Sequence, residues 1–207
     1  MISLVLLRHG ETDWNATRRL QGWAPVPLNE RGREQAAAAA EHLADEYDVD
    51  RVLASDLRRT RETARPVCAA VGREATFELA WRERDVGVYQ GLDYDDFLDG
   101  YPEFDVEQSG IAAVRARPEG GESVLDLRER VLDRWNALLD ASGAEETVLV
   151  VTHGGPIYTI FDAVRGRSVV DSFRSGKHQK NCAINEFHYD SETGAIEVVR
   201  ENETGYR

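Results

Sequence analysis

The stretch Ile2-Ser-Leu-Val-Leu-Leu-Arg-His-Gly10 decides the fold, because it joins a short apolar run to an abrupt polar end. The run Ile2 to Leu7 is apolar and partly β-branched, which is typical of a strand buried on both faces of a parallel sheet. A second run, Thr147 to Thr152, has the same character and ends in His153-Gly-Gly155. Ligands of open α/β sheets bind beyond the carboxyl ends of the strands, so both His-Gly ends indicate one site at one sheet edge.

Helical patterns separate these strands. A third short strand is expected over 51–54, and a fourth over about 76–79. Ser123 and Asp126 predict a capping box at the start of one helix. Strands that alternate with helices of ten or more residues predict a three-layer α/β/α sandwich around a mostly parallel sheet. The expected helices cover residues 30–47, 56–71, 123–139 and 154–164.

The length of 207 residues favours a single domain over 1–207. Residues 85–121 break the alternation, since they are rich in Asp, Gly and aromatic residues. We expect them to form an insertion of short helices and loops, a lid, over the C-terminal edge of the strands. Residues 184–189 and 196–200 flank Ser191-Glu-Thr-Gly194, which predicts a C-terminal hairpin.

The charge balance is strongly acidic, with 25 Lys and Arg against 38 Asp and Glu and a net charge of -13. A nucleic-acid binder would need a basic face, so this class is not expected. Lys177 and Lys180 are the only lysines in the sequence. An acidic, lysine-poor surface suits a salt-rich cytoplasm, which makes a halophilic source the expectation, against the alternative of an acidic mesophilic protein.

The two cysteines, Cys68 and Cys182, do not form a disulfide framework, which favours a reducing compartment. No stretch approaches the roughly 20 apolar residues that span a bilayer. The sequence thus predicts a soluble, cytoplasmic protein with no membrane partner. No pattern in it fixes the oligomeric state.

Arginines gather at the predicted site edge. Arg8 adjoins His9, and the segment 55–64 opens a helix after the 51–54 strand. The planar, permanently charged guanidinium suits phosphate oxygens, and free N–H groups at the helix start after Gly154 also favour an anion. For Arg58 and Arg61 we expect solvated ion pairs with Glu62 and its neighbours instead.

The segment Leu7-Arg-His-Gly-Glu-Thr-Asp-Trp-Asn15 resembles the signature of the histidine phosphatase superfamily, the phosphoglycerate mutase-like proteins. Four further motifs occur in the order of that family and extend the resemblance to residue 155. They are Ser55-x-Leu57-x-Arg59-Thr60, Glu83-Arg-Asp-Val-Gly87-x-x-x-Gly91, Gly120-Gly-Glu-Ser123 and Thr152-His-Gly-Gly155.

The resemblance implies a covalent mechanism. His9 would attack phosphorus and become a phosphohistidine. Arg8, Arg59 and His153 would hold the equatorial oxygens. Glu83 would protonate the leaving alkoxide and then activate water. These five residues are the expected catalytic set.

Further residues are candidates for binding the substrate. Asn15 and the Gly154 backbone match phosphate-contacting positions, and Gln21 and Gly22 match a loop near the substrate. Glu122 has two interpretations that the sequence leaves open, a pocket residue or a helix-end charge.

The aromatic residues in or near the lid also have two interpretations. They either stack on a substrate or form the core of the lid itself, and the second arrangement is the commoner one. They are Trp81, Tyr89, Tyr94, Phe97, Tyr101 and Phe104.

We expect no metal and no cofactor. No ligand spacing of a known metal site is present, and the flanking arginines would repel a cation. The expected partner is a small-molecule phosphate monoester, whose identity the sequence does not specify.

The resemblance leaves a phosphatase, a cofactor-dependent mutase and a non-catalytic phospho-ligand binding protein as alternatives. All five catalytic positions are filled, which favours an enzyme. The mutase subgroup has Glu-Arg-His-Tyr-Gly where this chain has Glu83-Arg-Asp-Val-Gly87, and basic residues in its insertion, whereas residues 88–114 here hold no Lys or Arg. We expect this acidic lid to repel a doubly charged glycerate, which favours the phosphatase branch.

Overall fold

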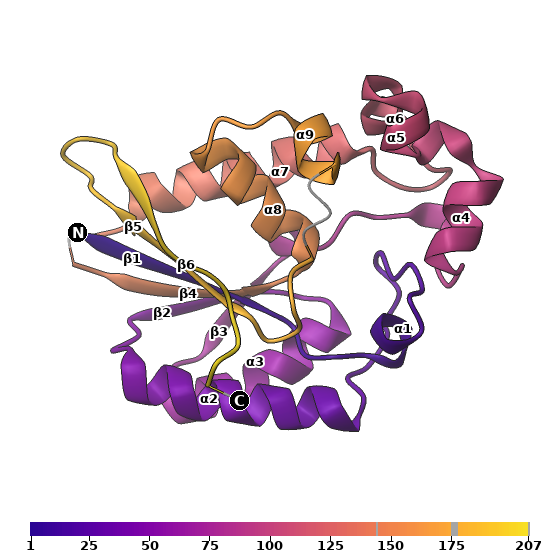
Figure 1. The fold of residues 1–207 in the computed structure, drawn as a ribbon. Helices are drawn as coiled ribbons and strands as arrows, with labels where there is room; N and C mark the ends of the chain where they lie inside the picture. The colour runs from indigo at the N-terminus through magenta and orange to yellow at the C-terminus, as the bar shows by residue number, and fades with distance from the viewer. Residues whose placement is uncertain (144, 175–177, 207) are drawn as a thin grey trace.

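The computed structural model describes residues 1–143, 145–174 and 178–206, so Lys177 lies outside the described residues. A six-stranded sheet runs through the described chain in the order β3-β2-β4-β1-β5-β6 (Figure 1). The first four are mutually parallel, and β5 and β6 are antiparallel additions at one side. The strands are β1 (Ile2–Arg8), β2 (Arg51–Ser55), β3 (Ala75–Glu78), β4 (Thr147–Thr152), β5 (Ile184–Tyr189) and β6 (Ile196–Glu203).

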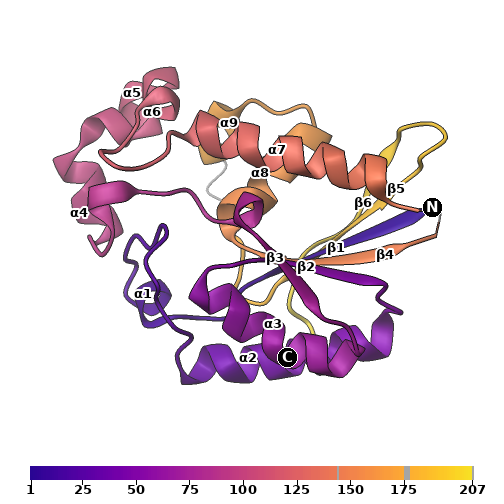
Figure 2. The same ribbon diagram turned by 180° about the vertical axis from the view of Figure 1, so that it is seen from behind.

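Helices cover both faces of the sheet, which confirms the expected α/β/α sandwich (Figures 1 and 2). One face carries α2 (Glu30–Glu46) and α3 (Arg58–Val71), and the other carries α7 (Val124–Ala141) and α8 (Gly154–Val164). The central strand β1 divides its side chains between the layers. Val5 and Leu7 belong to the core under α2 and α3, while Leu4 and Leu6 belong to the core under α7 and α8. Burial on both faces accounts for its unbroken apolar run.

The predicted start of α7 is confirmed. The Ser123 side chain accepts from the backbone N–H of Asp126, and the Asp126 carboxylate accepts from the Ser123 backbone N–H. This reciprocal capping fixes where α7 begins. Leu127 and Val131 are buried one helical turn apart against the sheet. The cap therefore also fixes which side chains α7 turns toward the site and which it turns toward the core.

The insertion at 85–121 lies beyond the carboxyl ends of the parallel strands, where it was expected (Figure 1). Its aromatic rings contact one another, with Tyr89 centred 4.5 Å from Tyr101 and 5.1 Å from Phe97. Phe104 joins them, so these rings form the insertion's own core. The insertion consists of η2 (Gly87–Tyr89), α4 (Tyr94–Gly100), η3 (Pro102–Phe104), α5 (Val106–Ser109) and α6 (Ile111–Arg115).

Three short elements complete the site edge: α1 (Asp13–Ala16) after β1, η1 (Leu79–Trp81) after β3, and α9 (Val169–Arg174) after α8. Trp81, whose place was open, is fully buried in the core under α7 and α8 and does not belong to the lid. The predicted elements are confirmed apart from small shifts of their ends; β6, for example, continues to Glu203. None of the described helices is long and apolar enough to cross a membrane.

Candidate active site

His9 follows β1 directly and is 2% exposed. Its backbone N–H donates to the Thr152 carbonyl oxygen at 3.0 Å, which ties the end of β1 to the end of β4. Its Nδ1 lies 2.8 Å from the Gly10 carbonyl oxygen. A carbonyl oxygen only accepts, so Nδ1 carries the ring proton and Nε2 keeps its lone pair. Burial, followed by the charges of Arg59 and Arg8, holds the His9 pKa well below its usual range. The neutral ring therefore offers a nucleophilic nitrogen at Nε2.

His153 stands at the matching end of β4 and is fully buried. Its ring centre lies 5.1 Å from that of His9, so the structure brings the two predicted histidines together. Its Nε2 lies 2.8 Å from the Ser55 hydroxyl oxygen, and its Nδ1 is buried with no hydrogen-bond partner among the described residues. Burial, then the charges of Arg59, His9 and Arg8, lowers its pKa well below the usual value.

Arg59 and Arg8 bring two positive charges to the histidines. The Arg59 side chain is 1% exposed, and its Nε lies 3.3 Å from Nε2 of His9. Its other nitrogens donate to the Gly22 carbonyl oxygen at 2.9 Å and to the Ala24 carbonyl oxygen at 3.3 Å. Burial lowers the Arg59 pKa to about 10, so the group keeps its charge at neutral pH. Arg8 donates to the Gln179 carbonyl oxygen, while its Nε is buried and without a described partner. Such a guanidinium is suited to an anion.

Glu83 lies after β3 and η1, on the loop where the sequence placed a proton donor. Its carboxylate accepts from the backbone N–H of Arg84 at 2.9 Å and of Gly155 at 3.1 Å. A Cβ atom at Gly154 would lie 4.0 Å from both the Arg8 Nε and the Glu83 Oε2. The Glu83 carboxylate, the Arg8 guanidinium and the first turn of α8 therefore lie close together.

Asn15 belongs to α1, and its side-chain oxygen accepts from the backbone and the hydroxyl of Thr12. It also accepts from the Asn181 side chain at 3.3 Å. Asn181 in turn donates to the His9 carbonyl oxygen at 3.1 Å. The sequence reasoning missed Asn181, because a lone polar residue in a loop before β5 carries no pattern that marks a site.

The loop of Gln21 and Gly22 lies against the site through Arg59. Gly22 has a φ of 51°, and its carbonyl oxygen accepts from Arg59. A Cβ atom there would come within 2.7 Å of Val86, so the turn requires glycine. The Gln21 side-chain oxygen is buried with no partner among the described residues. Nothing in these contacts ties Gln21 to an oxygen of the substrate, and its role stays a prediction.

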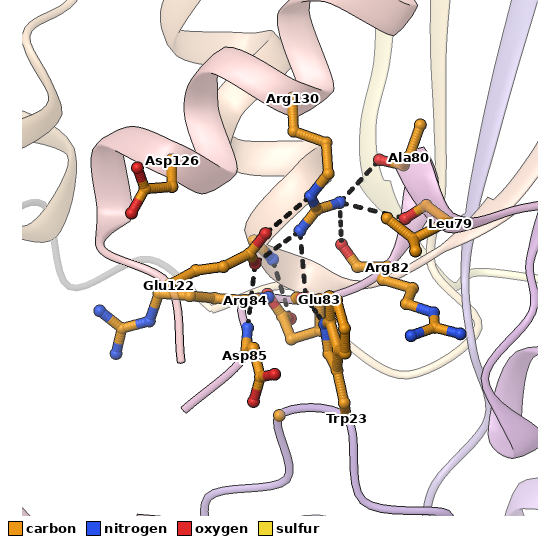
Figure 3. A network of polar contacts seen from close by, with 12 residues as sticks. Trp23, Leu79, Ala80, Arg82, Glu83, Arg84, Asp85, Glu122, Asp126 and Arg130 are labelled. Carbon is orange, nitrogen blue, oxygen red and sulfur yellow. Dashed lines mark hydrogen bonds and ion pairs between the residues drawn. The ribbon is translucent and has the colours of Figure 1, made fainter. Parts of the chain in front are cut away.

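Glu122 supports the Glu83 loop (Figure 3). Both of its oxygens accept from the Arg130 guanidinium, at 2.8 and 2.9 Å, and one accepts from the backbone N–H of Asp85 at 3.1 Å. Arg130 also donates to the carbonyl oxygens of Ala80, Arg82 and Glu83. Glu122 is not among the residues that line the pocket described below, but neither are His9 and Glu83, so its two interpretations both stay predictions. It acts by holding, with Arg130, the loop that carries the carboxyl group.

The remaining arginines of the segment 55–64 lie outside the site, as predicted. Arg58 pairs with Glu62 at 2.7 Å on the surface of α3. Arg61 donates to the Asp56 carbonyl oxygen and covers the Phe77 ring. Only Arg59, on the buried side of the helix, reaches His9.

A pocket of about 740 Å³ opens from this centre. Arg8, Asn15 and Gly155 line its inner part, and Tyr94 is the residue of the 85–121 insertion that lines it. None of the acidic residues of the insertion is among the lining residues, whereas Arg18, Arg19 and Arg128 are. The lid carboxylate Asp95 pairs with Arg18 of the lining, so the expected repulsion of a doubly charged substrate by the lid stays a prediction. No group of side chains suited to a metal ion occurs among the described residues.

Comparisons with known proteins agree with this geometry. The family model of the histidine phosphatase superfamily (branch 1) matches residues 4–202. A phosphoglycerate mutase-like protein 4 of Arabidopsis thaliana is 36% identical, over 94% of this chain and 83% of its own. A metal-independent phosphoserine phosphatase of the same plant is 37% identical, over 76% of this chain and 66% of its own.

A solved structure is similar over almost the whole chain. The mycobacterial glucosyl-3-phosphoglycerate phosphatase in complex with VO3 has a TM-score of 0.81 and 30% identity, and the match covers 98% of this chain and 99% of that one. The family match, these relatives and the filled catalytic positions agree with one another. The chain belongs to the histidine phosphatase superfamily, as an enzyme of the phosphoric monoester hydrolase class.

Proposed function

We propose that this protein is a metal-independent phosphatase that hydrolyses a small phosphate monoester through a phosphohistidine on His9. The observation that carries the proposal is the state of the His9 ring. Its Nδ1 proton is donated to the Gly10 carbonyl oxygen at 2.8 Å, and the lone pair of its Nε2 accepts from Nε of Arg59 at 3.3 Å. A nucleophilic nitrogen beside a buried cation is an arrangement that phosphoryl transfer requires.

In the first step the Nε2 lone pair of His9 forms the P–N bond, and the bond from phosphorus to the ester oxygen breaks. Arg8 and Arg59 neutralise charge on the equatorial oxygens, and His153 donates a hydrogen bond to one of them. The Glu83 carboxyl group gives its proton to the leaving oxygen, so that an alcohol departs rather than an alkoxide. The backbone N–H of Gly155 holds the Glu83 carboxylate in place at 3.1 Å.

In the second step Glu83, now ionised, takes a proton from water while the water oxygen attacks phosphorus. The P–N bond breaks, and Nε2 of His9 recovers its lone pair. Inorganic phosphate leaves, and both residues return to their starting states. The two steps together consume one water molecule and the ester, and neither step uses a metal ion or a cofactor.

A phosphatase is favoured over a mutase on the motif. Asp85 and Val86 stand where the mutase subgroup has His and Tyr, and the insertion supplies no basic side chain to the pocket. The similarity to a metal-independent phosphoserine phosphatase supports the same choice. Phosphoserine and glucosyl-3-phosphoglycerate, the substrates named for two of the similar proteins, each carry a carboxylate as well as the phosphate ester.

The test is hydrolysis of p-nitrophenyl phosphate in excess EDTA, with and without vanadate, at low and high KCl. We expect turnover that resists EDTA and is blocked by vanadate, which mimics the five-coordinate phosphorus of the transition state. Turnover that EDTA abolishes would contradict the metal-free mechanism. Binding of phosphate without turnover of any ester would favour the phospho-ligand binding protein, and transfer between two glycerates would favour the mutase.

A further inference from the structure

Arg128 lies on α7, one helical turn after Val124, and both residues line the pocket. The side chain is half-buried. Leu127, its neighbour in the chain, lies 3.0 Å from where a Cβ atom of Gly155 would stand, and that same Cβ would meet the Glu83 carboxylate. Arg128 therefore follows directly in the chain after Leu127, which packs beside Gly155 and Glu83. It lies on the side where the leaving group of the substrate must sit, because Glu83 protonates that group.

The Arg128 guanidinium makes no hydrogen bond or ion pair with any other residue that the structure describes. The other two arginines on the following turns of α7 are both paired. Arg130 binds Glu122 at 2.8 Å, and Arg134 binds Glu78 at 2.6 Å. Arg128 therefore differs from the two other arginines of α7, since it lines the pocket and has no carboxylate partner among the described residues.

The surroundings of Arg128 favour an anion. The pocket is also lined by Arg18 and Arg19, and these two are engaged elsewhere. Arg18 pairs with Asp95 at 2.9 Å, and Arg19 donates to the Gly91 carbonyl oxygen at 2.7 Å. Asp162 is the carboxylate among the described lining residues, and it is 5% exposed. A group on the substrate that reaches Arg128 can therefore accept hydrogen bonds from the unpaired N–H groups of its guanidinium.

We propose that Arg128 determines specificity by binding a carboxylate on the leaving group of the substrate. One guanidinium supplies one positive charge and two parallel donors, which match a carboxylate in both charge and shape. This inference rests on the proposed phosphatase function and narrows its substrate to esters that carry an acid group as well as the phosphate.

The test uses pairs of esters that differ only in that group. In the three-carbon pair, 3-phosphoglycerate is compared with glycerol 3-phosphate; in the six-carbon pair, 6-phosphogluconate is compared with glucitol 6-phosphate. In each pair a carboxylate replaces a CH2OH group. We measure kcat and KM for the wild type, for Arg128→Gln, for Arg128→Lys and for the control Arg65→Gln. Arg65 is an exposed arginine of α3 that does not line the pocket.

In at least one pair, the wild type should prefer the carboxylate ester. Arg128→Gln should lower kcat/KM for that ester roughly 10- to 100-fold, mainly through KM, as expected for the loss of a charge-assisted hydrogen bond. The same variant should hydrolyse the matched alcohol ester with the kcat/KM of the wild type. Arg128→Lys should keep part of the preference for the carboxylate ester, and Arg65→Gln should behave as the wild type.

Two results would overturn the proposal, and they are distinguishable. If Arg128→Gln lowers turnover of both members of each pair equally, or changes neither, the residue does not read the carboxylate, while the phosphatase function stands. If the wild type hydrolyses none of these esters and no p-nitrophenyl phosphate, the proposed function itself fails, and the assignment of Arg128 fails with it.

Discussion

The hydroxyl of Ser55, at the end of β2, lies 2.8 Å from Nε2 of His153, at the end of β4. The Leu57 backbone N–H donates to the same hydroxyl oxygen at 3.3 Å, so the Ser55 proton is left for the imidazole. His153 then accepts at Nε2 and carries its proton on Nδ1, the buried nitrogen with no described partner. In the proposed mechanism, Ser55 would thus position His153 as a hydrogen-bond donor to a phosphate oxygen.

Ser55→Ala should lower kcat/KM on p-nitrophenyl phosphate roughly tenfold, because the change removes one hydrogen bond that fixes the His153 tautomer. Vanadate should also bind more weakly to the variant, whereas its free energy of unfolding should change little. Steady-state kinetics measures kcat/KM, and inhibition by vanadate measures how tightly vanadate binds. The variant Ser55→Thr, which keeps the hydroxyl, should retain more activity than Ser55→Ala. Unchanged vanadate affinity in Ser55→Ala would contradict the positioning role.

His9→Ala should abolish hydrolysis of every ester while the fold is retained, since the change removes the side chain that attacks the ester phosphorus in the proposed mechanism. The matched control is His188→Ala, which removes a histidine of β5 that contacts Glu186. Circular dichroism and p-nitrophenyl phosphate turnover provide the two readouts. Turnover that persists in His9→Ala would show that another group is the nucleophile.

Glu83→Gln should slow alkyl phosphates far more than p-nitrophenyl phosphate, because nitrophenolate leaves without a proton and an alkoxide does not. The comparison is made on kcat/KM, which covers the steps up to departure of the leaving group and does not include hydrolysis of the shared phosphohistidine. Both leaving groups are measured on one protein, so any change in stability cancels. An equal loss on both substrates would mean that Glu83 does not act as the proton donor.

The buried histidines predict how stability depends on pH. The pKa of His9 and of His153 lies well below the usual value in the folded chain, chiefly through burial. Below the unfolded value of about 6.5 the unfolded chain therefore binds more protons, and the free energy of unfolding falls as pH falls. The slope should reach about 1.4 kcal/mol per pH unit for each histidine.

Urea unfolding of the ligand-free protein between pH 5 and 8 measures this slope. The free energy of unfolding of His9→Gln should depend less on pH, with a slope lower by up to one proton than that of the wild type. The same low pKa keeps the His9 ring neutral in the free enzyme, so kcat/KM should not decline as pH is lowered through 6.5. A decline centred there would contradict the assignment of a neutral nucleophile.

The acidic composition predicts that salt stabilises the protein. With a net charge of -13, self-repulsion is screened as KCl rises. We expect the midpoint of thermal unfolding to increase with KCl up to molar concentrations. A midpoint that is the same in dilute buffer and in molar KCl would remove the argument for a halophilic source.

The sequence was sufficient for the sheet and the catalytic centre because both depend on local patterns. The apolar runs that end at His9 and His153 predict buried parallel strands, and parallel strands bring their carboxyl ends to one edge. The predicted cap at Ser123 depends on residues three apart in the chain, and the structure confirms it. The choice of Glu83, in contrast, rested on the resemblance to the histidine phosphatase superfamily.

Residues that act through distant contacts were not predictable. Asn181 reaches His9 and Asn15 from 172 and 166 residues away, and no spacing marks such a contact. Glu122 has a role only because Arg130 and the Asp85 amide face it. The effect of the lid on a charged substrate was inferred from its acidic composition, but which of its side chains line the pocket depends on how the chain packs. Arg128 was missed for the same reason.

The central claim, a phosphoryl group carried on His9, is tested most directly by trapping that intermediate. The wild type is mixed with p-nitrophenyl phosphate and quenched in alkali, which preserves phosphohistidine, and the peptides are analysed by mass spectrometry. We predict one added phosphoryl group on the peptide that contains His9, its absence in His9→Ala, and its accumulation in a Glu83→Gln variant that is slow to activate water. Rapid hydrolysis with no phosphoryl group on that peptide, or with one on another residue, would contradict the account.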